Sequence, residues 1–316
     1  MSELYVANTD NYWFDFLKER APLEDVNFWK PKPQTFRAIS EGQLFVFRLK
    51  SPRDVIGGYG ILASSINVPI QLAWDSLGER NGSPTMGHMI KMIRQYRSDQ
   101  HIDAQSIIGC RVLTSPIFFD KDEWFPVPPD WSSNIVTGKV YSTDTQEGEN
   151  LMAALEARTR SDILFRRGQR MFDRSGFSDQ QQARYGTPIA IAPRLGQGAF
   201  RIKVAEAYRF ECALSDTRVL PALEAAHIHP YSDGGSHSLS NGIFLRKDIH
   251  SVLDAGFATF TDDLRFHVSG KITETFNNGN EYKRLHGKIL KLPLLDEQRP
   301  SLDSIRWHQT NRFVGD

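Results

Sequence analysis

A histidine-containing segment between Ala225 and Asp254 constrains this chain more than any other part of its sequence. It reads AAHIHPYSDGG from Ala225 and continues as NGIFLRKDIH from Asn241 to His250. The short apolar run before the two glycines favours a strand, and the run that ends at His250 leads into a helix. Residues four apart on a helix share one face, so the side chains of His250 and Asp254 can reach one cation together.

The spacings within this segment predict that three polar side chains come together. His227 precedes Asn241 by fourteen residues, and Asn241 precedes His250 by nine. The pair Gly234-Gly235 permits a tight return of the chain, which brings Asn241 back beside the strand that carries His227. We therefore expect a strand over residues 223–228, a glycine-containing loop, and a helix that carries His250.

This segment resembles the HNH, or ββα-metal, nuclease superfamily. The likeness is to the branch whose motif is an Ala-Ala-His-Ile strand, a glycine-containing loop, and Asn-Gly followed by an Arg-x-Asp-Ile-His helix; it covers residues 194–270. The resemblance implies cleavage of DNA, with His227 as the general base that deprotonates water and Asn241 holding the His227 ring by a hydrogen bond. It also implies that His250 and Asp254 ligate one divalent metal ion, Mg²⁺ or Mn²⁺.

The segment departs from the family pattern in two places. Many HNH enzymes have a metal-binding Asp or His directly before the base, and this chain has Ala226 there. Ligation would then fall on His250 and Asp254, with His229 left open as a third ligand. Paired Cys-x-x-Cys motifs for a structural zinc ion are absent, so the domain must be held by packing. The aromatic residues expected to supply that packing are Phe200, Tyr208, Phe244 and Phe257.

The charge pattern is compatible with a phosphodiester substrate. Arg246 and Lys247 precede His250 by about one helical turn, where they can contact phosphate, Arg246 through two nitrogen atoms. The net charge of the chain is zero, but residues 156–203 contain ten basic and four acidic side chains, a local charge of +6. Screening makes this local charge the one that a phosphate backbone meets, although a solvated arginine-rich helix is an equal alternative.

Residues 1–143 have the composition of a β-rich domain. Aromatic and branched residues predict strands over three runs: 42–50, 55–63 and 107–113, the last ended by Pro116. The apolar spacing over residues 84–97 predicts a helix. Strands wrapped around one or two helices suggest a small β-barrel. The expected fold class is therefore α+β, with a barrel followed by a ββα-metal domain.

This β-rich part is similar to the PUA-like superfamily, which includes the EVE, ASCH and SRA domains. The likeness rests on NFWKP at residues 27–31, on the run over 42–50, and on IGGYG at residues 56–60. Members commonly hold a modified base, often flipped out of a duplex, in an aromatic-lined pocket. The resemblance implies a pocket in which Trp29 and Tyr59 stack on the base and Asn27 bonds its edge.

Together the two resemblances are typical of a modification-dependent restriction endonuclease. The expected organisation is a recognition domain over 1–143, an arginine-rich helical linker over 144–193 and an endonuclease domain over 194–316. The substrate would be double-stranded DNA with 5-methyl- or 5-hydroxymethylcytosine, cut by a homodimer because one HNH site cuts one strand. Two alternatives stay open. The nuclease could act on phosphorothioate or unmodified DNA, or Ala226 could mark a degenerate metal site in a DNA-binding protein that does not cleave.

The composition excludes several other classes of protein. No apolar run reaches the roughly 20 residues that a membrane span needs, and the first residues lack a secretion-signal pattern. The two cysteines, Cys110 and Cys212, are too few for a disulfide scaffold or an all-cysteine zinc site. They fit a reducing compartment. We therefore expect a cytoplasmic protein with no membrane partner, and a buried Cys212.

Overall fold

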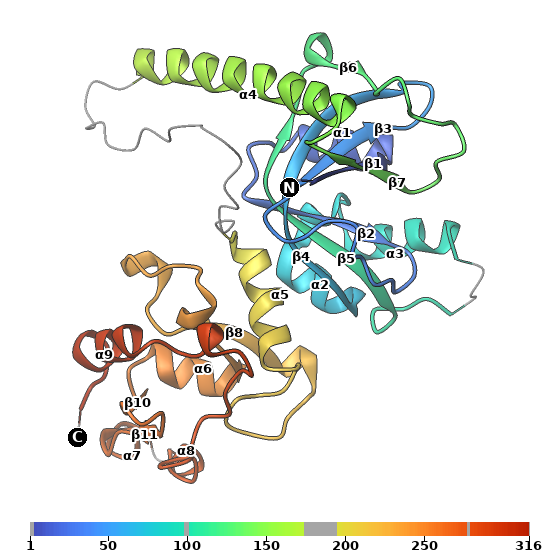
Figure 1. Ribbon diagram of the computed structural model, residues 1–316. Helices are drawn as coiled ribbons and strands as arrows, with labels where there is room; N and C mark the ends of the chain where they lie inside the picture. Colours follow the sequence, from blue (N-terminus) through green and yellow to red (C-terminus); the bar gives the residue numbers. More distant parts are fainter. Residues whose placement is uncertain (1–2, 98–100, 174–194, 277–278, 316) are drawn as a thin grey trace. The chain divides into compact units, whose positions relative to one another are not determined.

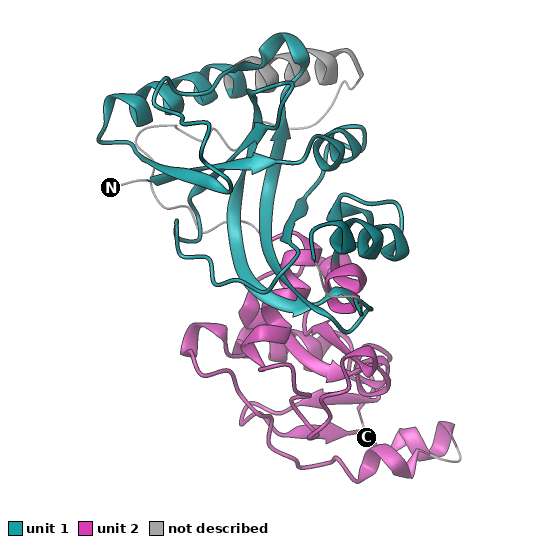
Figure 2. Cartoon of the chain, turned by 90° about the vertical axis from the view of Figure 1, so that its right-hand side faces the viewer, with its two compact units in different colours: residues 1–70, 77–193 teal, residues 71–76, 194–316 magenta. Residues whose placement is uncertain are grey.

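The computed structural model of the protein describes residues 3–97, 101–173, 195–276 and 279–315, with side chains in the long helix described up to Thr159 (Figure 1). The chain forms two compact units (Figure 2): unit 1 comprises residues 1–70 and 77–193, and unit 2 comprises residues 71–76 and 194–316. The division by function into a recognition domain, a linker and an endonuclease domain, with boundaries after residues 143 and 193, stays a prediction. No helix among the described residues is long and apolar enough to cross a membrane.

Unit 1 is built on a seven-stranded sheet. Its strands are β1 (Glu3–Thr9), β2 (Asp25–Lys30), β3 (Leu44–Leu49), β4 (Val55–Pro69), β5 (Ile107–Phe118), β6 (Phe125–Pro126) and β7 (Gly138–Ser142). They are ordered β2-β5-β4-β3-β1-β7, with β6 paired to β4. Only the β1–β3 pair is parallel among these pairs. Because β2 and β7 end this order among the described strands, the predicted closure into a barrel stays a prediction.

Among the helices of unit 1, α1 (Asn11–Lys18) supplies aromatic side chains to the core. The others are α2 (Ile70–Leu77), which unit 2 shares, α3 (Met86–Gln95) and α4 (Gln146–Asp173), with short 3₁₀ turns η1 (Gly78–Asn81) and η2 (Lys121–Glu123). Helix α1 begins after Asp10, whose carboxylate accepts hydrogen bonds from the Tyr12 and Trp13 N–H groups. Trp13 and Phe14 are buried from this helix and pack against Phe47 of β3.

Most of the predicted elements of unit 1 are confirmed, but two strands extend beyond their predicted ends. The strand predicted over 55–63 is β4, which continues to Pro69. The helix predicted over 84–97 is α3, capped by the Thr85 hydroxyl. The strand predicted to end at Pro116 continues to Phe118. A proline cannot donate a ladder hydrogen bond, but it is tolerated at an irregularity. Here the pairing of β4 with β5 shifts register twice, and Ser115 has a positive φ of 49°.

Unit 2 confirms the local predictions for the histidine-containing segment. Strand β8 (Leu223–His227) pairs antiparallel with β9 (Gly242–Arg246), and helix α6 (Lys247–Asp254) follows directly. A second antiparallel strand pair is formed by β10 (Ala258–Phe260) with β11 (Phe266–Val268). The remaining elements are α5 (Gln197–Ala207), α7 (Lys271–Thr275), α8 (Asn280–Lys283), α9 (Leu302–Asn311), and the 3₁₀ turns η3 (Leu220–Ala222), η4 (Tyr231–Asp233), η5 (Leu239–Asn241) and η6 (Asp296–Gln298).

The core of unit 2 is formed as the sequence predicts. Phe200, Tyr208 and Phe244 are buried in one cluster with Cys212, and the partly buried Phe257 packs against it. Helix α5 lies very close to the strand pair at Gly242. A Cβ atom there would lie 2.5 Å from Val204 and 3.0 Å from the Phe200 ring. This close approach places the Phe200 ring beside the end of β8, where the candidate base lies.

Candidate active site and base pocket

Two consecutive elements carry the ionisable groups of the candidate active site. His227 is the last residue of β8 and pairs with Gly242 of β9, while Glu224 enters from the same strand. His250 lies on α6, which starts directly after β9. The hairpin return at Gly234 has a φ of 96°, a conformation that favours glycine. The site is therefore assembled by the local order strand, loop, strand, helix.

His250 lies between two carboxylates. Its Nδ1 is 2.6 Å from Oε1 of Glu224, and its Nε2 is 3.1 Å from Oδ2 of Asp254. Burial opposes the charged form of this imidazole, but hydrogen bonds and charge from Asp254 and Glu224 outweigh it and raise the pKa of His250 to about 9. The same contact, chiefly through the hydrogen bond, lowers the pKa of Glu224. Glu224 is thus a site residue that the sequence interpretation missed.

His227 has the opposite electrostatic environment. Its ring stacks on Phe200 with centroids 4.0 Å apart and an interplanar angle of 11°. Its Nε2 is 2.9 Å from Nδ1 of His237. Burial, followed by the charges of His237, His250 and Arg201, lowers the pKa of His227 to about 4. A histidine with this pKa is neutral at physiological pH, which is the form that can accept a proton from water.

Asn241 is buried, but its hydrogen bonds differ from those expected. Its Nδ2 donates to the carbonyl oxygens of His229 and Ser236, both at 2.8 Å, and its Oδ1 accepts from the His229 N–H at 2.9 Å. The expected bond to the His227 ring is not among these contacts. Asn241 instead ties together the two ends of the loop that follows β8, so it supports the site through the backbone.

The next two residues to consider are His229, left open as a third metal ligand, and Ala226, which stands directly before His227. The Nε2 of His229 lies 3.0 Å from the Asp233 carbonyl oxygen, and its ring stacks on Trp307 at 3.8 Å. Both contacts lie within the loop and α9, so the structure gives no support to His229 as a third ligand. Ala226 is fully buried in the core cluster, so its methyl group belongs to the packing of unit 2.

Arg246 and Lys247, which are expected to contact phosphate, differ in how readily their charged groups can reach it. The Arg246 guanidinium makes a two-point contact with the Asp248 carboxylate, at 3.0 and 2.5 Å. This hydrogen bond, more than the charge, raises the pKa of Arg246. Arg246 must therefore give up this partner before it can bind phosphate in the two-point manner expected. Lys247 is exposed at the start of α6, where its ammonium group can meet an anion.

The side chains of His250 and Asp254 fit a divalent cation. Mg²⁺ binds its oxygen ligands at about 2.0–2.1 Å in octahedral geometry, which separates neighbouring ligand atoms by about 2.9 Å. The separation of 3.1 Å between Nε2 and Oδ2 is close to that spacing. Glu224, on the other ring nitrogen, occupies the place of the outer carboxylate that commonly orients a metal-bound histidine. Among the described residues, no group of three or more His, Cys, Asp or Glu side chains has a metal-site arrangement.

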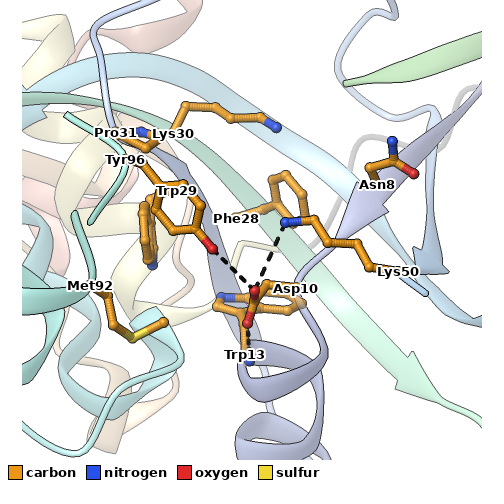
Figure 3. A pocket seen from close by; sticks show the side chains of 10 residues that line it. All are labelled: Asn8, Asp10, Trp13, Phe28, Trp29, Lys30, Pro31, Lys50, Met92 and Tyr96. Atoms are coloured by element: carbon orange, nitrogen blue, oxygen red, sulfur yellow. Dashed lines mark hydrogen bonds and ion pairs between the residues drawn. The ribbon is translucent and has the colours of Figure 1, made fainter. Parts of the chain in front are cut away.

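Unit 1 contains a separate open pocket of about 140 Å³ at the end of β2 (Figure 3). Its lining residues are Asn8, Asp10, Trp13, Phe28, Trp29, Lys30, Pro31, Lys50, Met92 and Tyr96. The Tyr96 hydroxyl lies 3.4 Å and the Lys50 ammonium 3.9 Å from Oδ2 of Asp10 (Figure 3). Burial, with Arg111 and Lys50 nearby, lowers the pKa of Lys30 to about 8. Aromatic faces and a few polar groups therefore meet in one cavity.

Of the three residues predicted for a base pocket, only Trp29 lines this cavity. Its indole N–H donates to the Asn81 carbonyl at 3.0 Å, which fixes the ring. Asn27 is fully buried and donates to Asn81 Oδ1 and Cys110 Sγ, so it cannot reach a base edge. Tyr59 is bonded through its hydroxyl to Thr159 at 2.8 Å and packs near Phe119, away from the cavity lining. Asn27 and Tyr59 are thus not among the residues that line this cavity, and their part in a base pocket stays a prediction.

The arginine-rich stretch is described only at its ends. The Arg158 guanidinium packs over the Phe125 ring at 4.2 Å and donates to the Glu123 carbonyl oxygen. At the other end, Arg201 of α5 is close enough to lower the pKa of both Glu224 and His227. The side chains of the arginines between residues 160 and 194 lie outside the described residues. A contact between this stretch and DNA therefore stays a prediction.

Sequence signals existed for some of the missed residues. Glu224 lies in the same strand motif, three residues before His227. A carboxylate at that position can orient a histidine on the helix that follows. His237 lies in a serine-rich loop with no periodic pattern, so no spacing rule places it in the site. The contacts of Asp10 and Tyr96 join residues 86 positions apart, which no spacing rule addresses.

Comparison with known proteins gives one family match, at the site just described. Residues 212–261 match the HNH endonuclease family, so unit 2 contains an HNH endonuclease domain and the resemblance predicted for it is confirmed. No curated protein matches the chain.

Two solved structures illustrate what else the chain is similar to. An ASCH protein from Zymomonas mobilis is 12% identical, with 47% of this chain and 94% of that chain covered and a TM-score of 0.31. A modification-dependent restriction endonuclease, TagI, is 12% identical, with 91% of this chain and 75% of that chain covered and a TM-score of 0.25.

Proposed function

We propose that this protein is a divalent-metal-dependent endonuclease that hydrolyses DNA near a modified base, with 5-methyl- or 5-hydroxymethylcytosine as the mark. The observation that carries the nuclease proposal is the combination, within the segment matched by the HNH family, of a neutral His227 and the His250–Asp254 pair. The first supplies a base, and the second supplies two ligands for a cation. Metal-assisted phosphodiester hydrolysis uses both.

His227 is the proposed general base. Its ring plane is fixed by Phe200, and its low pKa keeps a lone pair available at neutral pH. A base of low pKa is a weaker proton acceptor, but it is almost entirely in the reactive form. The proton of the attacking water passes to this ring, and the resulting hydroxide attacks phosphorus.

His250 and Asp254 are the proposed metal ligands, and Glu224 orients His250. When bound, the cation supplies Lewis-acid stabilisation of the charge that develops on the phosphate and leaving oxygen. Glu224 accepts a hydrogen bond from Nδ1–H of His250, which leaves the Nε2 lone pair directed at the side of Asp254. His250 must lose its second proton for this, so ligand binding competes with protonation.

The cavity around Trp29 is the proposed base pocket, in place of the set Asn27, Trp29 and Tyr59. Trp29 and Tyr96 offer aromatic faces for a flipped pyrimidine, which must replace the stacking that it loses on leaving the duplex. The carboxylate of Asp10 faces the same cavity. Cytosine presents an amino group as donor, and a carboxylate is a suitable acceptor for it. This chemistry favours a modified cytosine over a modified thymine.

A homodimer, or paired binding of two copies, is part of the proposal. One HNH site contains one base and one cation site and therefore cuts one strand at a time. Double-strand cleavage then needs two sites on one DNA. Sedimentation of the protein with and without DNA tests this assembly directly.

Cleavage of four plasmids tests the proposed function. Methylated, hydroxymethylated, phosphorothioated and plain plasmids are incubated with the protein and Mg²⁺ or Mn²⁺. We expect cutting of the cytosine-modified plasmids only, and loss of cutting in His227→Ala with DNA binding retained. Equal cleavage of all four would refute the recognition of a mark, and cutting of the phosphorothioated plasmid alone would identify another mark. No cleavage of any plasmid, with tight binding of all, would identify a DNA-binding protein that does not cut.

A further inference from the structure

The imidazole of His237 is a direct neighbour of the proposed base. Its Nδ1 lies 2.9 Å from Nε2 of His227, and the two ring centroids are 5.0 Å apart. His237 comes from the loop between η4 and η5, ten residues after His227. Nothing in the HNH motif discussed above accounts for a second imidazole at this place.

The position of His237 is built into the loop. Its ring stacks on Tyr231 with centroids 4.2 Å apart and an interplanar angle of 8°. The preceding residue, Ser236, is held through its carbonyl oxygen by Asn241. A Cβ atom on Gly235 would lie 1.9 Å from the His229 carbonyl oxygen, so the loop can close this tightly only with glycine there. The Asn241 side chain and the Tyr231 ring thus hold His237 against His227.

The contact limits which nitrogen of His227 can act as the base. A neutral imidazole has one N–H donor and one lone-pair acceptor. If Nε2 of His227 accepted a proton from Nδ1 of His237, its own proton would be on Nδ1, and His227 would have no lone pair left for water. If Nε2–H of His227 instead donates to Nδ1 of His237, the lone pair on Nδ1 of His227 is available. Only the second arrangement gives a competent base while the contact persists.

We propose that His237 is a positioning residue for His227: its Nδ1 accepts the Nε2–H of His227 and keeps the Nδ1 lone pair of His227 for the attacking water. This inference rests on the proposed function of His227. The proton lost by water forms a new N–H bond at Nδ1 of His227, and the electron pair of the broken O–H bond stays on the hydroxide oxygen. The imidazolium keeps its Nε2–H bond to His237, and no bond at His237 breaks.

Two substitutions separate this role from a merely structural one. His237→Ala removes the acceptor. His237→Asn retains one, because the Asn side-chain oxygen can stand close to the position of Nδ1. We expect His237→Ala to lower the single-turnover cleavage rate at least about tenfold. A general base contributes a factor of about 10²–10⁴ to the rate, and the loss of its positioning should remove part of that factor. DNA affinity, measured without cleavage in Ca²⁺, should stay within about twofold, since a positioning role acts on the chemical step. His237→Asn should recover most of the rate.

Three results would overturn the inference. An unchanged rate in His237→Ala would mean that the contact is irrelevant, and a faster rate would mean that His237 blocks the base. Equal loss in His237→Asn and His237→Ala would mean that the acceptor does not matter. His286→Ala, which removes an exposed imidazole from the same unit, serves as the matched control and should cleave normally. If His227→Ala itself still cleaves, the proposed function of His227 has failed, whereas an active His237→Ala beside an inactive His227→Ala refutes only this inference.

Discussion

The two candidate sites of this protein differ in how far apart their residues lie in the sequence. The site in unit 2 is formed by residues 224–254, on two neighbouring strands and the helix that follows them. The pocket in unit 1 is lined by residues from Asn8 to Tyr96, on strands and helices that are not consecutive. Spacing rules describe local geometry, so the sequence brings His227, Asn241, His250 and Asp254 of the first site together, although it misses Glu224 and His237, and it predicts the second kind of site only as a class.

The two sites also differ in how their electrostatics are arranged. In unit 2, one histidine is kept neutral by burial and neighbouring positive charge, while another is kept protonated by two carboxylates. In unit 1, the polar groups surround an aromatic cavity, and burial lowers the pKa of Lys30 towards neutrality. The first arrangement suits chemistry on a charged substrate, and the second suits the binding of a planar ring.

The largest expected effect is on the proposed metal ligand of unit 2. His250→Ala removes one of two ligands, so the several kcal/mol that a cation supplies to the transition state should be lost, about 10³-fold in rate. DNA binding by the same variant should be retained, because His250 is not a proposed DNA contact. Single-turnover cleavage and a binding titration check both halves. Retained cleavage would show that the compact site of unit 2 is assigned wrongly.

A smaller effect is expected at the carboxylate that the sequence interpretation missed. Glu224→Gln should weaken Mn²⁺ binding by about 10- to 100-fold, as losses of a carboxylate that orients a metal-bound histidine do. Excess Mn²⁺ should restore cleavage in this variant but not in His250→Ala. Isothermal titration of both variants measures the affinities. Unchanged Mn²⁺ affinity in Glu224→Gln would remove Glu224 from the site.

The high pKa of His250 predicts how metal affinity depends on pH. Below its pKa of about 9, the imidazole carries a proton that the metal must displace. Apparent Mn²⁺ affinity should therefore rise about tenfold for each pH unit between pH 6 and 8, and level off near pH 9. Titrations at several pH values in buffers of different ionisation heat also report the released proton. A flat affinity profile would contradict the proposal that His250 is a ligand.

The same pH series is informative about folding. The folded-state pKa of His227, about 4, lies below its ordinary value of 6.5. Between these values the unfolded chain binds a proton that the folded chain does not, so this histidine lowers the stability as the pH falls from about 6.5 to 4. His227→Ala should lose stability less steeply than the natural protein over that range. Urea unfolding at pH 7 and pH 5 measures the difference.

The smallest expected effect concerns the dispersed pocket of unit 1. Trp29→Ala should weaken binding of cytosine-modified DNA at least about fivefold relative to plain DNA, because one stacking partner is worth about 1–3 kcal/mol. Tyr59→Phe serves as the matched control, since it keeps the ring and loses only the hydroxyl that bonds Thr159. It should leave the preference unchanged. If Tyr59→Phe loses the preference and Trp29→Ala does not, the proposed pocket around Trp29 is wrong.

The sequence by itself determined the local part of this protein. A short apolar run placed strand β8, the two glycines placed the return, and the run ending at His250 placed helix α6. The four-residue spacing placed Asp254 beside His250. These features depend on backbone geometry over a few residues, which a motif encodes directly. The aromatic core of unit 2 was predictable for the same reason, because apolar periodicity marks the faces that must be buried.

Only the tertiary structure decided which side chains meet across the fold. Asn27 belongs to the same strand as Trp29, but it is covered by Asn81, which lies 54 residues further along the chain. His237 meets His227 because Asn241 and Tyr231 hold the loop in place. Contacts of this kind depend on how separate elements pack, and many sequences with the same local pattern pack differently. The sequence therefore predicted an HNH site, while the fold determined which residues support it.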